Sequence, residues 1–116
     1  MTLYRGFRGE GGAAFVTADG RPLDPRHDIA HLCDEFDWGY AGAGPEQLAL
    51  ALLIDHWDDP SRALGQYRLF LRRVVKGLRG DEWTLKAHEI DEAFSEGVVD
   101  SPLTLDQLVA KLTGKG

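Results

Sequence analysis

A glycine-spaced turn ahead of an apolar helix is the first place where this chain could bind a ligand. Glycine permits backbone angles that other residues resist, and the free N–H groups at a helix N-terminus attract anions. Here the glycines precede Pro45 and the apolar run 48–54. A small anion or a nucleotide could therefore bind at this turn. The candidate ligand-binding residues are Trp38, Tyr40, Gly42, Gly44 and Gln47.

The details of this turn do not match the common phosphate loops. No lysine follows the glycines, as a Walker loop requires. The dinucleotide fingerprint also fails, because Gln47 stands at its third glycine position. Pro45 removes one N–H donor, and Glu46 would repel a phosphate. We therefore favour a structural turn that lets Trp38 and Tyr40 pack over the helix, with anion binding as the alternative.

A basic stripe is the second candidate site. The segment 62–79 carries six positive side chains and no Asp or Glu. Phosphate contacts by such a stripe would make nucleic-acid binding strongly salt-dependent. However, the net charge is −6, and no aromatic residue interleaves with the stripe as a stacking platform. The other interpretation is a solvated face, partly neutralised by an acidic helix of this chain or of a partner. The stripe consists of Arg68, Arg72, Arg73, Lys76 and Arg79.

Metal binding and nucleophilic catalysis have little support. Zinc ligands usually come in tightly spaced pairs, and the possible ligands in the segment 27–34 do not. None of the three serines lies in a Gly-x-Ser-x-Gly turn. We expect no metal, no cofactor and no catalytic residue, and we regard an enzyme as the minority interpretation. The possible metal ligands are His27, Asp28, His31, Cys33 and Asp34.

The composition is typical of a soluble, cytoplasmic protein. The chain has 116 residues, with 43% hydrophobic and 28% charged residues, which suits one globular domain. The longest apolar run, 48–54, is much shorter than a membrane span. The single cysteine, Cys33, fits a reducing compartment.

The order of patterns predicts an α+β fold. Residues 3–23 are expected to form a three-stranded antiparallel N-terminal meander, with Asp19-Gly20 as a hairpin turn. Gly44 is expected to cap a helix that begins at Pro45 and runs to about Trp57. Because this helix has no polar face over 48–54, it should be buried at the centre of the fold.

Two or three further helices should surround the central one. Asp59 and Pro60 are typical of a helix start, and Gly77 or Gly80 could end that second helix. Thr84 is expected to cap a third helix with an acidic outer face. These elements complete a single domain over residues 1–97. Residues 98–116 form a C-terminal extension, for which a stripe of leucine and valine predicts a short docked amphipathic helix.

The central motif resembles that of a family of small prokaryotic and phage-borne proteins, domain of unknown function 6166. The shared pattern is Trp-Gly-Tyr-x-Gly-x-Gly-Pro-x-Gln-Leu-Ala-Leu-Ala, which spans residues 38–51 here. Tyr4-Arg5-Gly6 and the turn from Asp19 to Leu23 are also similar. Ala41 and Ala43 replace a glycine and a serine of the family pattern. The resemblance covers roughly residues 3–94 and brings no known activity with it.

The sequence favours a protein-interaction or accessory module over an enzyme. Opposite charges on the second and third predicted helices would suit a protein partner or self-association. Carriage of similar proteins by phages and plasmids suggests a role in conflict or regulation. Nucleic-acid binding by Arg68, Arg72 and Lys76, and anion binding by the Gly42–Gly44 turn, remain alternatives.

Overall fold

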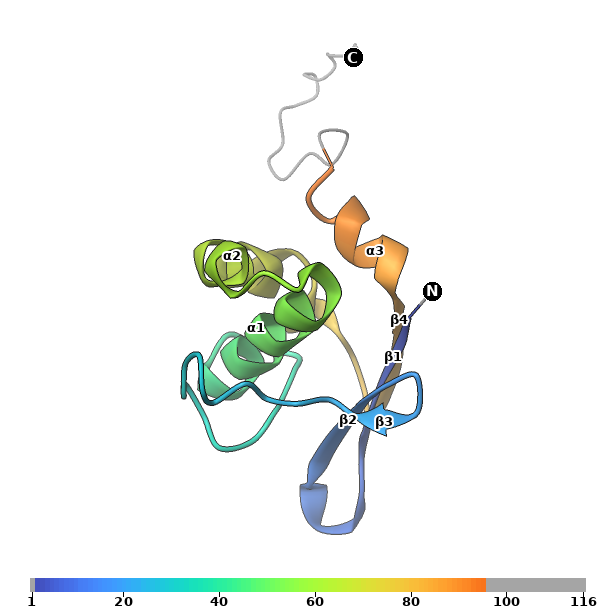
Figure 1. The fold of residues 1–116 in the computed structure, drawn as a ribbon. Coiled ribbons are helices and arrows are strands. Elements are labelled where there is room, and N and C mark those ends of the chain that lie inside the picture. The colour runs from blue at the N-terminus through green and yellow to red at the C-terminus, as the bar shows by residue number, and fades with distance from the viewer. Residues whose placement is uncertain (1, 96–116) are drawn as a thin grey trace.

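The fold has two layers, a sheet and a group of helices that covers one of its faces (Figure 1). The structure, a computed structural model, describes residues 2–95. The predicted C-terminal extension and its docked helix therefore lie outside the described residues. Within residues 2–95, a four-stranded antiparallel sheet with three α-helices confirms the α+β class.

The sheet has one strand more than the predicted three-stranded meander. The meander is present as β1 (Leu3–Arg8), β2 (Ala14–Ala18) and β3 (Arg21–Pro22). A fourth strand, β4 (Glu82–Lys86), pairs antiparallel with β1 and gives the order β3-β2-β1-β4. The predicted helix start at Thr84 is therefore wrong, since Thr84 pairs with Arg5 within the sheet. Buried and exposed residues alternate along β4. This alternation has the two-residue period of a strand and not the period of a helix.

The helix boundaries also differ in part from the prediction. Helix α1 (Ala43–Trp57) has its N-cap at Gly42, so Gly44 lies within the first turn and does not cap the helix. Helix α2 (Pro60–Arg73) begins as predicted, and the Asp59 carboxylate accepts a hydrogen bond from the Arg62 N–H at 3.1 Å. It ends at Arg73, before the predicted glycines, and the short 3-10 turn η2 (Val75–Gly77) follows it. Helix α3 (Ala87–Glu92) starts only after β4.

The prediction of a buried central helix is confirmed. The residues from Leu48 to Ile54 are at most 2% exposed. Helix α1 packs against α2, η2 and α3, and lies on the helix side of the sheet (Figure 1). Tyr4 of β1 is fully buried, and its hydroxyl donates to the Asp55 carboxylate at 2.7 Å. Burial, followed by the neighbouring Asp55, raises the pKa of Tyr4, so this hydroxyl stays protonated.

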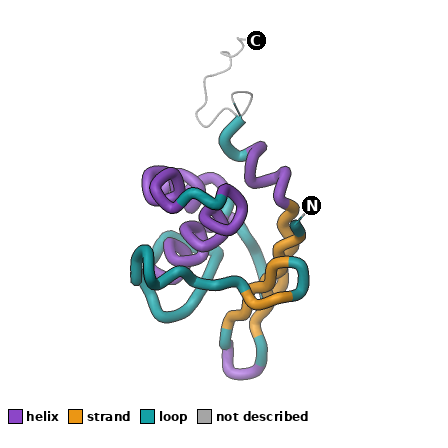
Figure 2. The backbone as a smooth tube through the Cα atoms, in the orientation of Figure 1, coloured by secondary structure: helices purple, strands orange, loops and turns teal. Residues whose placement is uncertain are grey.

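A long loop, residues 23–42, joins β3 to α1 and contains no helix or strand (Figure 2). Trp38 and Tyr40 lie in this loop. A connection of this length in a small domain needs specific attachments, because its buried backbone groups require partners. Trp38 and Gln47 of the motif take part in these attachments.

We expect Gly6→Ala to destabilise the domain, because a methyl group at this position would overlap the indole of Trp83 on the neighbouring strand β4. Overpacking of this kind typically costs about 1–3 kcal/mol. Gly65→Ala is the matched control, since nothing lies within 4 Å of a methyl group there. Gly65 is inside α2, so its substitution should stabilise by up to about 1 kcal/mol.

Urea denaturation followed by circular dichroism would measure both changes in the free energy of unfolding. Equal stability of the Gly6→Ala variant and the native chain would contradict the tight packing of β1 against Trp83.

Candidate functional site

Gln47 attaches the loop 23–42 to helix α1. Its side chain is fully buried. The amide oxygen accepts from the N–H groups of Leu32 and Cys33 at 2.6 and 2.9 Å. The amide nitrogen donates to the carbonyls of Pro25 and Ala30 at 2.7 and 3.0 Å. A primary amide has two acceptor sites and two donors, so these four bonds use its full capacity.

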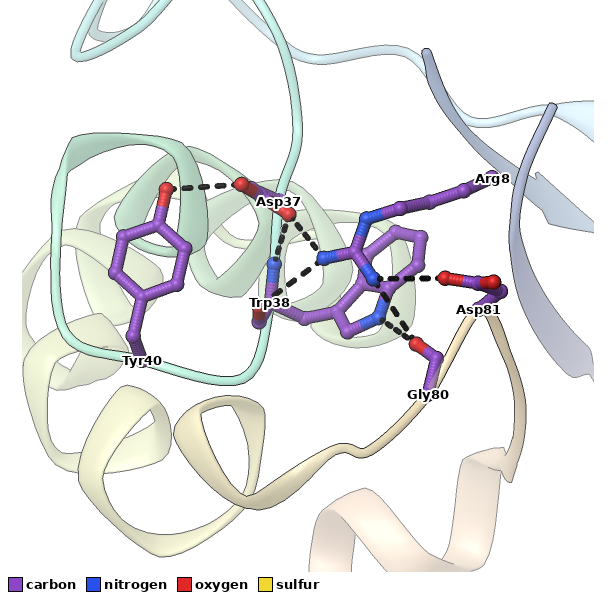
Figure 3. Close-up of polar contacts among 6 residues, drawn as sticks. All are labelled: Arg8, Asp37, Trp38, Tyr40, Gly80 and Asp81. Atoms are coloured by element: carbon purple, nitrogen blue, oxygen red, sulfur yellow. Dashed lines mark hydrogen bonds and ion pairs between the residues drawn. The ribbon is translucent and has the colours of Figure 1, made fainter. Parts of the chain in front are cut away.

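Arg8, at the end of β1, makes the second attachment (Figure 3). Its guanidinium donates to the Asp37 carboxylate at 2.5 Å and to the Gly80 carbonyl at 3.0 Å. The guanidinium also lies 4.4 Å above the Trp38 ring. One arginine thus connects the sheet, the loop before α1 and the loop before β4.

Trp38 is held in the interior by the same cluster. It is 1% exposed, and its indole N–H donates to the Gly80 carbonyl at 2.9 Å. Its ring meets Trp83 of β4 edge-on, with 5.6 Å between the ring centroids. This is a favourable aromatic geometry, and it packs the loop against the sheet.

Asp37 is ionised and fully engaged in this cluster. It accepts hydrogen bonds from the Trp38 N–H and from the Tyr40 hydroxyl, both at 2.9 Å (Figure 3). Burial alone would raise the pKa of Asp37, but the bonds from Arg8, Trp38 and Tyr40 outweigh it and hold the pKa below its ordinary 3.8. The hydrogen bond to Asp37, with burial second, raises the pKa of Tyr40. Tyr40 is therefore a neutral donor and is poorly suited to act as a base.

The glycines of the turn are required by contacts within the chain. Gly44 is buried, and a Cβ atom there would lie 2.9 Å from the Asp37 Cβ. Gly39 has a φ of 89°, and its N–H donates to the Val75 carbonyl at 3.1 Å. The loop before α1 therefore packs closely against the first turn of that helix. Close packing of the chain on itself explains the glycine spacing without a ligand.

The predicted ligand-binding residues do not converge on one exposed site. Trp38, Gly44 and Gln47 are buried, whereas Gly42 is partly buried and Tyr40 is 49% exposed. Tyr40 thus points its hydroxyl back to the loop and leaves half of its surface in solvent. Trp38 is buried, as the interpretation of a structural turn predicts, whereas Tyr40 remains half exposed.

The basic stripe is divided by the fold. Arg68, Arg72, Lys76 and Arg79 are exposed. Arg73 turns towards α3 instead, and its Nη1 donates to the Ala93 carbonyl at 2.6 Å. Over residues 2–95, none of the exposed four forms an ion pair with a carboxylate.

Two of the three acidic residues of α3 pair with histidines, and the third, Glu89, accepts a hydrogen bond from the Lys86 N–H at 2.7 Å. Asp91 pairs with His56 at 2.9 Å, and Glu92 pairs with His88 at 3.1 Å. Within the described part of the chain, the third helix therefore does not neutralise the exposed residues of the basic stripe.

The histidines of the long loop contact each other and the loop itself. The rings of His27 and His31 stack with 4.1 Å between centroids. The Nε2 atom of His27 lies 2.9 Å from the Cys33 carbonyl oxygen, and that of His31 lies 2.6 Å from the Asp34 carboxylate. Within the part of the chain that the structure describes, no group of three or more His, Cys, Asp or Glu could hold a metal ion.

A protein-family model described as a family of unknown function (DUF6166) matches residues 4–96. The chain belongs to this family. The match confirms the resemblance seen in the sequence and extends from β1 past α3. No curated protein and no solved structure matches the DUF6166 chain. Among its described residues, no helix is long and apolar enough to cross a membrane.

The sequence analysis missed two polar residues of the cluster around Trp38, namely Arg8 and Asp37. Their positions are 29 apart in the chain, so no local spacing pairs the one with the other. The one available signal was that Asp37 lies between Phe36 and Trp38. A charged residue inside an aromatic run suggests a specific partner, because a buried charge must be paired.

We expect Gln47→Leu to destabilise the DUF6166 domain by about 3 kcal/mol, because four backbone groups of the loop would lose their partner. Gln47→Glu should also be destabilising, since a carboxylate cannot donate to the carbonyls of Pro25 and Ala30. Gln66→Leu on α2 is the matched control and should change stability by at most about 0.5 kcal/mol. Urea denaturation would measure all three. If Gln47→Leu behaved like the control, Gln47 would have no role as an anchor.

The contribution of Asp37 to stability should depend on pH. Because its pKa is lowered in the folded state, its stabilising effect is fully present above its ordinary pKa of 3.8. It is lost as the pH falls from that value through the lower folded-state pKa. The native chain should therefore exceed Asp37→Asn in stability at pH 7, with the difference shrinking below about pH 4.

Denaturation of both proteins between pH 7 and pH 2.5 would test this expectation. A difference that did not change over this range would show that the Asp37 charge is not what stabilises the cluster.

Proposed function

We propose that this DUF6166 chain is a non-catalytic accessory module that binds a protein partner through the open face of its sheet. The observation that supports the proposal is a group of exposed apolar side chains on that face. The helices α1 and α2 lie on the other side of the sheet (Figure 1). Leu3, Phe7 and Phe15 are 36%, 40% and 50% exposed.

The two phenylalanines form one platform. Phe7 of β1 and Phe15 of β2 lie opposite each other in the strand register. Their rings stack with 5.5 Å between centroids and an interplanar angle of 23°. Paired aromatics on a rigid sheet lose little entropy when a partner covers them, and aromatic residues are enriched at the centres of interfaces.

The charges around the platform favour a partner with acidic residues at the edge of its apolar surface. By the strand alternation, Arg5 lies on the same face as Phe7. Lys86 pairs with Leu3, and Glu82 pairs with Phe7. Arg5 and Lys86 are thus two cations, against the one carboxylate of Glu82, at the paired strand positions of this face. Such complementarity aids both specificity and the rate of association.

The polar cluster around Asp37 supports a module without catalysis. Its arginine, carboxylate and phenol all satisfy one another, as a structural clamp requires. The proposal places the module in the cytoplasm, where Cys33 would remain a free thiol. Carriage of similar proteins by phages and plasmids suggests that the partner acts in conflict or regulation.

Nucleic-acid binding is the second candidate function. It is supported by Arg68 and Arg72 of α2 and by Lys76 of η2, which are exposed and form no ion pair with any carboxylate of the described residues. Anion binding by the Gly42–Gly44 turn is less favoured, because Gly44 and Gln47 are buried.

We expect Phe15→Asp to abolish partner binding without unfolding the chain, since Phe15 is half exposed. Leu64→Asp is the matched control, because Leu64 is a 44% exposed apolar residue on α2, away from the sheet. The tagged native chain and both variants would be purified from the cells that encode the protein. Bound proteins would be identified by mass spectrometry, self-association by light scattering and folding by circular dichroism.

A partner or a dimer present with the native chain and Leu64→Asp, but lost with Phe15→Asp, would support the proposal. A monomer with no partner, or a partner retained by folded Phe15→Asp, would contradict it. Salt-dependent DNA binding that Arg68→Glu/Arg72→Glu removes and Phe15→Asp retains would instead indicate the second function.

A further inference from the structure

The residues on the open face of the sheet lie in rows, because strands β2, β1 and β4 are neighbours. Phe15, Phe7 and Glu82 form one row, since the strand register places Phe7 opposite both of the others. The next row has Arg5 of β1 at its centre, with a threonine on each side. A row of two aromatic rings and a carboxylate therefore lies beside a row with a central cation.

The charged side chains of these two rows have no opposite charge to bind within the described domain. Arg5 and Glu82 are both exposed, and among residues 2–95 neither takes part in an ion pair. Arg8, on the other face of the sheet, pairs with Asp37. A charge that is taken out of water needs a partner. A molecule that covers the open face must therefore carry an anion for Arg5 and a cation for Glu82, next to apolar groups.

The open face itself has this combination of groups. When two identical faces meet, a two-fold axis repeats every contact twice. An axis that runs between the two rows brings the Arg5 row of each copy onto the Phe7 row of the other. The Arg5 guanidinium of one copy then lies over the Phe7 ring and beside the Glu82 carboxylate of the other. Such contacts are favourable at an interface, because the surrounding apolar groups exclude water.

We propose that the partner of the open face is a second copy of the same chain, and that Arg5 of each copy binds Phe7 and Glu82 of the other. This inference rests on the proposed function, because it names the partner for the same surface. Sheets that pack face to face keep their strand directions within about 30° of each other. The dimer has four layers, with the two sheets inside and α1 and α2 of each copy outside (Figure 1).

The small area of the face predicts a weak dimer. Strands lie about 4.8 Å apart and rise about 3.3 Å per residue, so three strands over five residues cover roughly 10 by 17 Å. Interfaces at the small end of the known range are typical of transient association. We therefore expect a dissociation constant in the micromolar range, at which monomer and dimer are both present.

Sedimentation equilibrium of the full chain, from micromolar to millimolar concentration, measures this constant, and circular dichroism checks folding. Phe15→Asp should weaken the dimer at least about tenfold, because it places a charge in the aromatic row. Leu64→Asp and Arg68→Glu are the matched controls for an apolar and a charged position. Both residues are exposed on α2, away from the sheet, so the dissociation constant should not change.

Exchange of the two charges tests the contact between Arg5 and Glu82. Arg5→Glu and Glu82→Arg should each weaken the dimer at least about tenfold, because like charges then face each other across the interface. The double variant Arg5→Glu/Glu82→Arg restores opposite charges, and should dimerise at least about tenfold more tightly than either single variant. A double variant that is no tighter than the single ones would overturn the inference.

The outcome for the dimer can be separated from the outcome for the proposed function. A native chain that stays monomeric at millimolar concentration, or a dimer that folded Phe15→Asp retains, would overturn the inference. If a monomeric native chain captured a different protein from its own cells and Phe15→Asp did not, the proposed function would stand without the dimer. A monomer that captures no protein would contradict both.

Discussion

The buried amide of Gln47 is the group on which the arrangement of the long loop depends. Helix α1 is apolar on the sides that it presents to the sheet, to α2 and to the loop, and Gln47 is the one buried polar side chain among the described residues. A loop that covers such a helix needs partners for its own backbone groups, because leaving them unpaired costs free energy. Gln47 supplies four of these partners from a single position. The remaining attachments of the loop, through Arg8 and Trp38, bring it against the sheet.

The attachment of the loop uses residues of the family motif. Most of the residues that distinguish the DUF6166 motif bond or pack within the chain. Trp38 and Gln47 are buried, and Asp37 is held by three donors. We therefore interpret the motif as a structural feature that attaches the loop to the rest of the domain. The exposed side chains Phe7 and Phe15, on which the proposed partner binding depends, lie outside the motif.

The sequence predicted those features that depend on neighbouring residues. Asp19-Gly20 forms the expected turn, with φ angles of 51° and 84°, and Asp59 caps α2 as its position before Pro60 suggested. The strand β4 was missed because Thr84 also suits a helix cap, and only the free edge of β1 decides between the two. Arg73 was assigned to the basic stripe because its spacing allows it. Its bond to Ala93 is a tertiary contact that no spacing shows.

The sequence by itself determined that α1 would be buried, because a helix that is apolar on every side is stable only when other elements surround it. It also determined the tight turn before α1, since the glycines there allow the chain to approach itself closely. The tertiary structure alone decided which groups meet across long separations, such as Tyr4 with Asp55, 51 positions apart. It also decided that Phe7 and Phe15 face solvent while Tyr4 faces the core. Each of these outcomes depends on which elements cover a given face, and a local pattern contains no information about its distant partner.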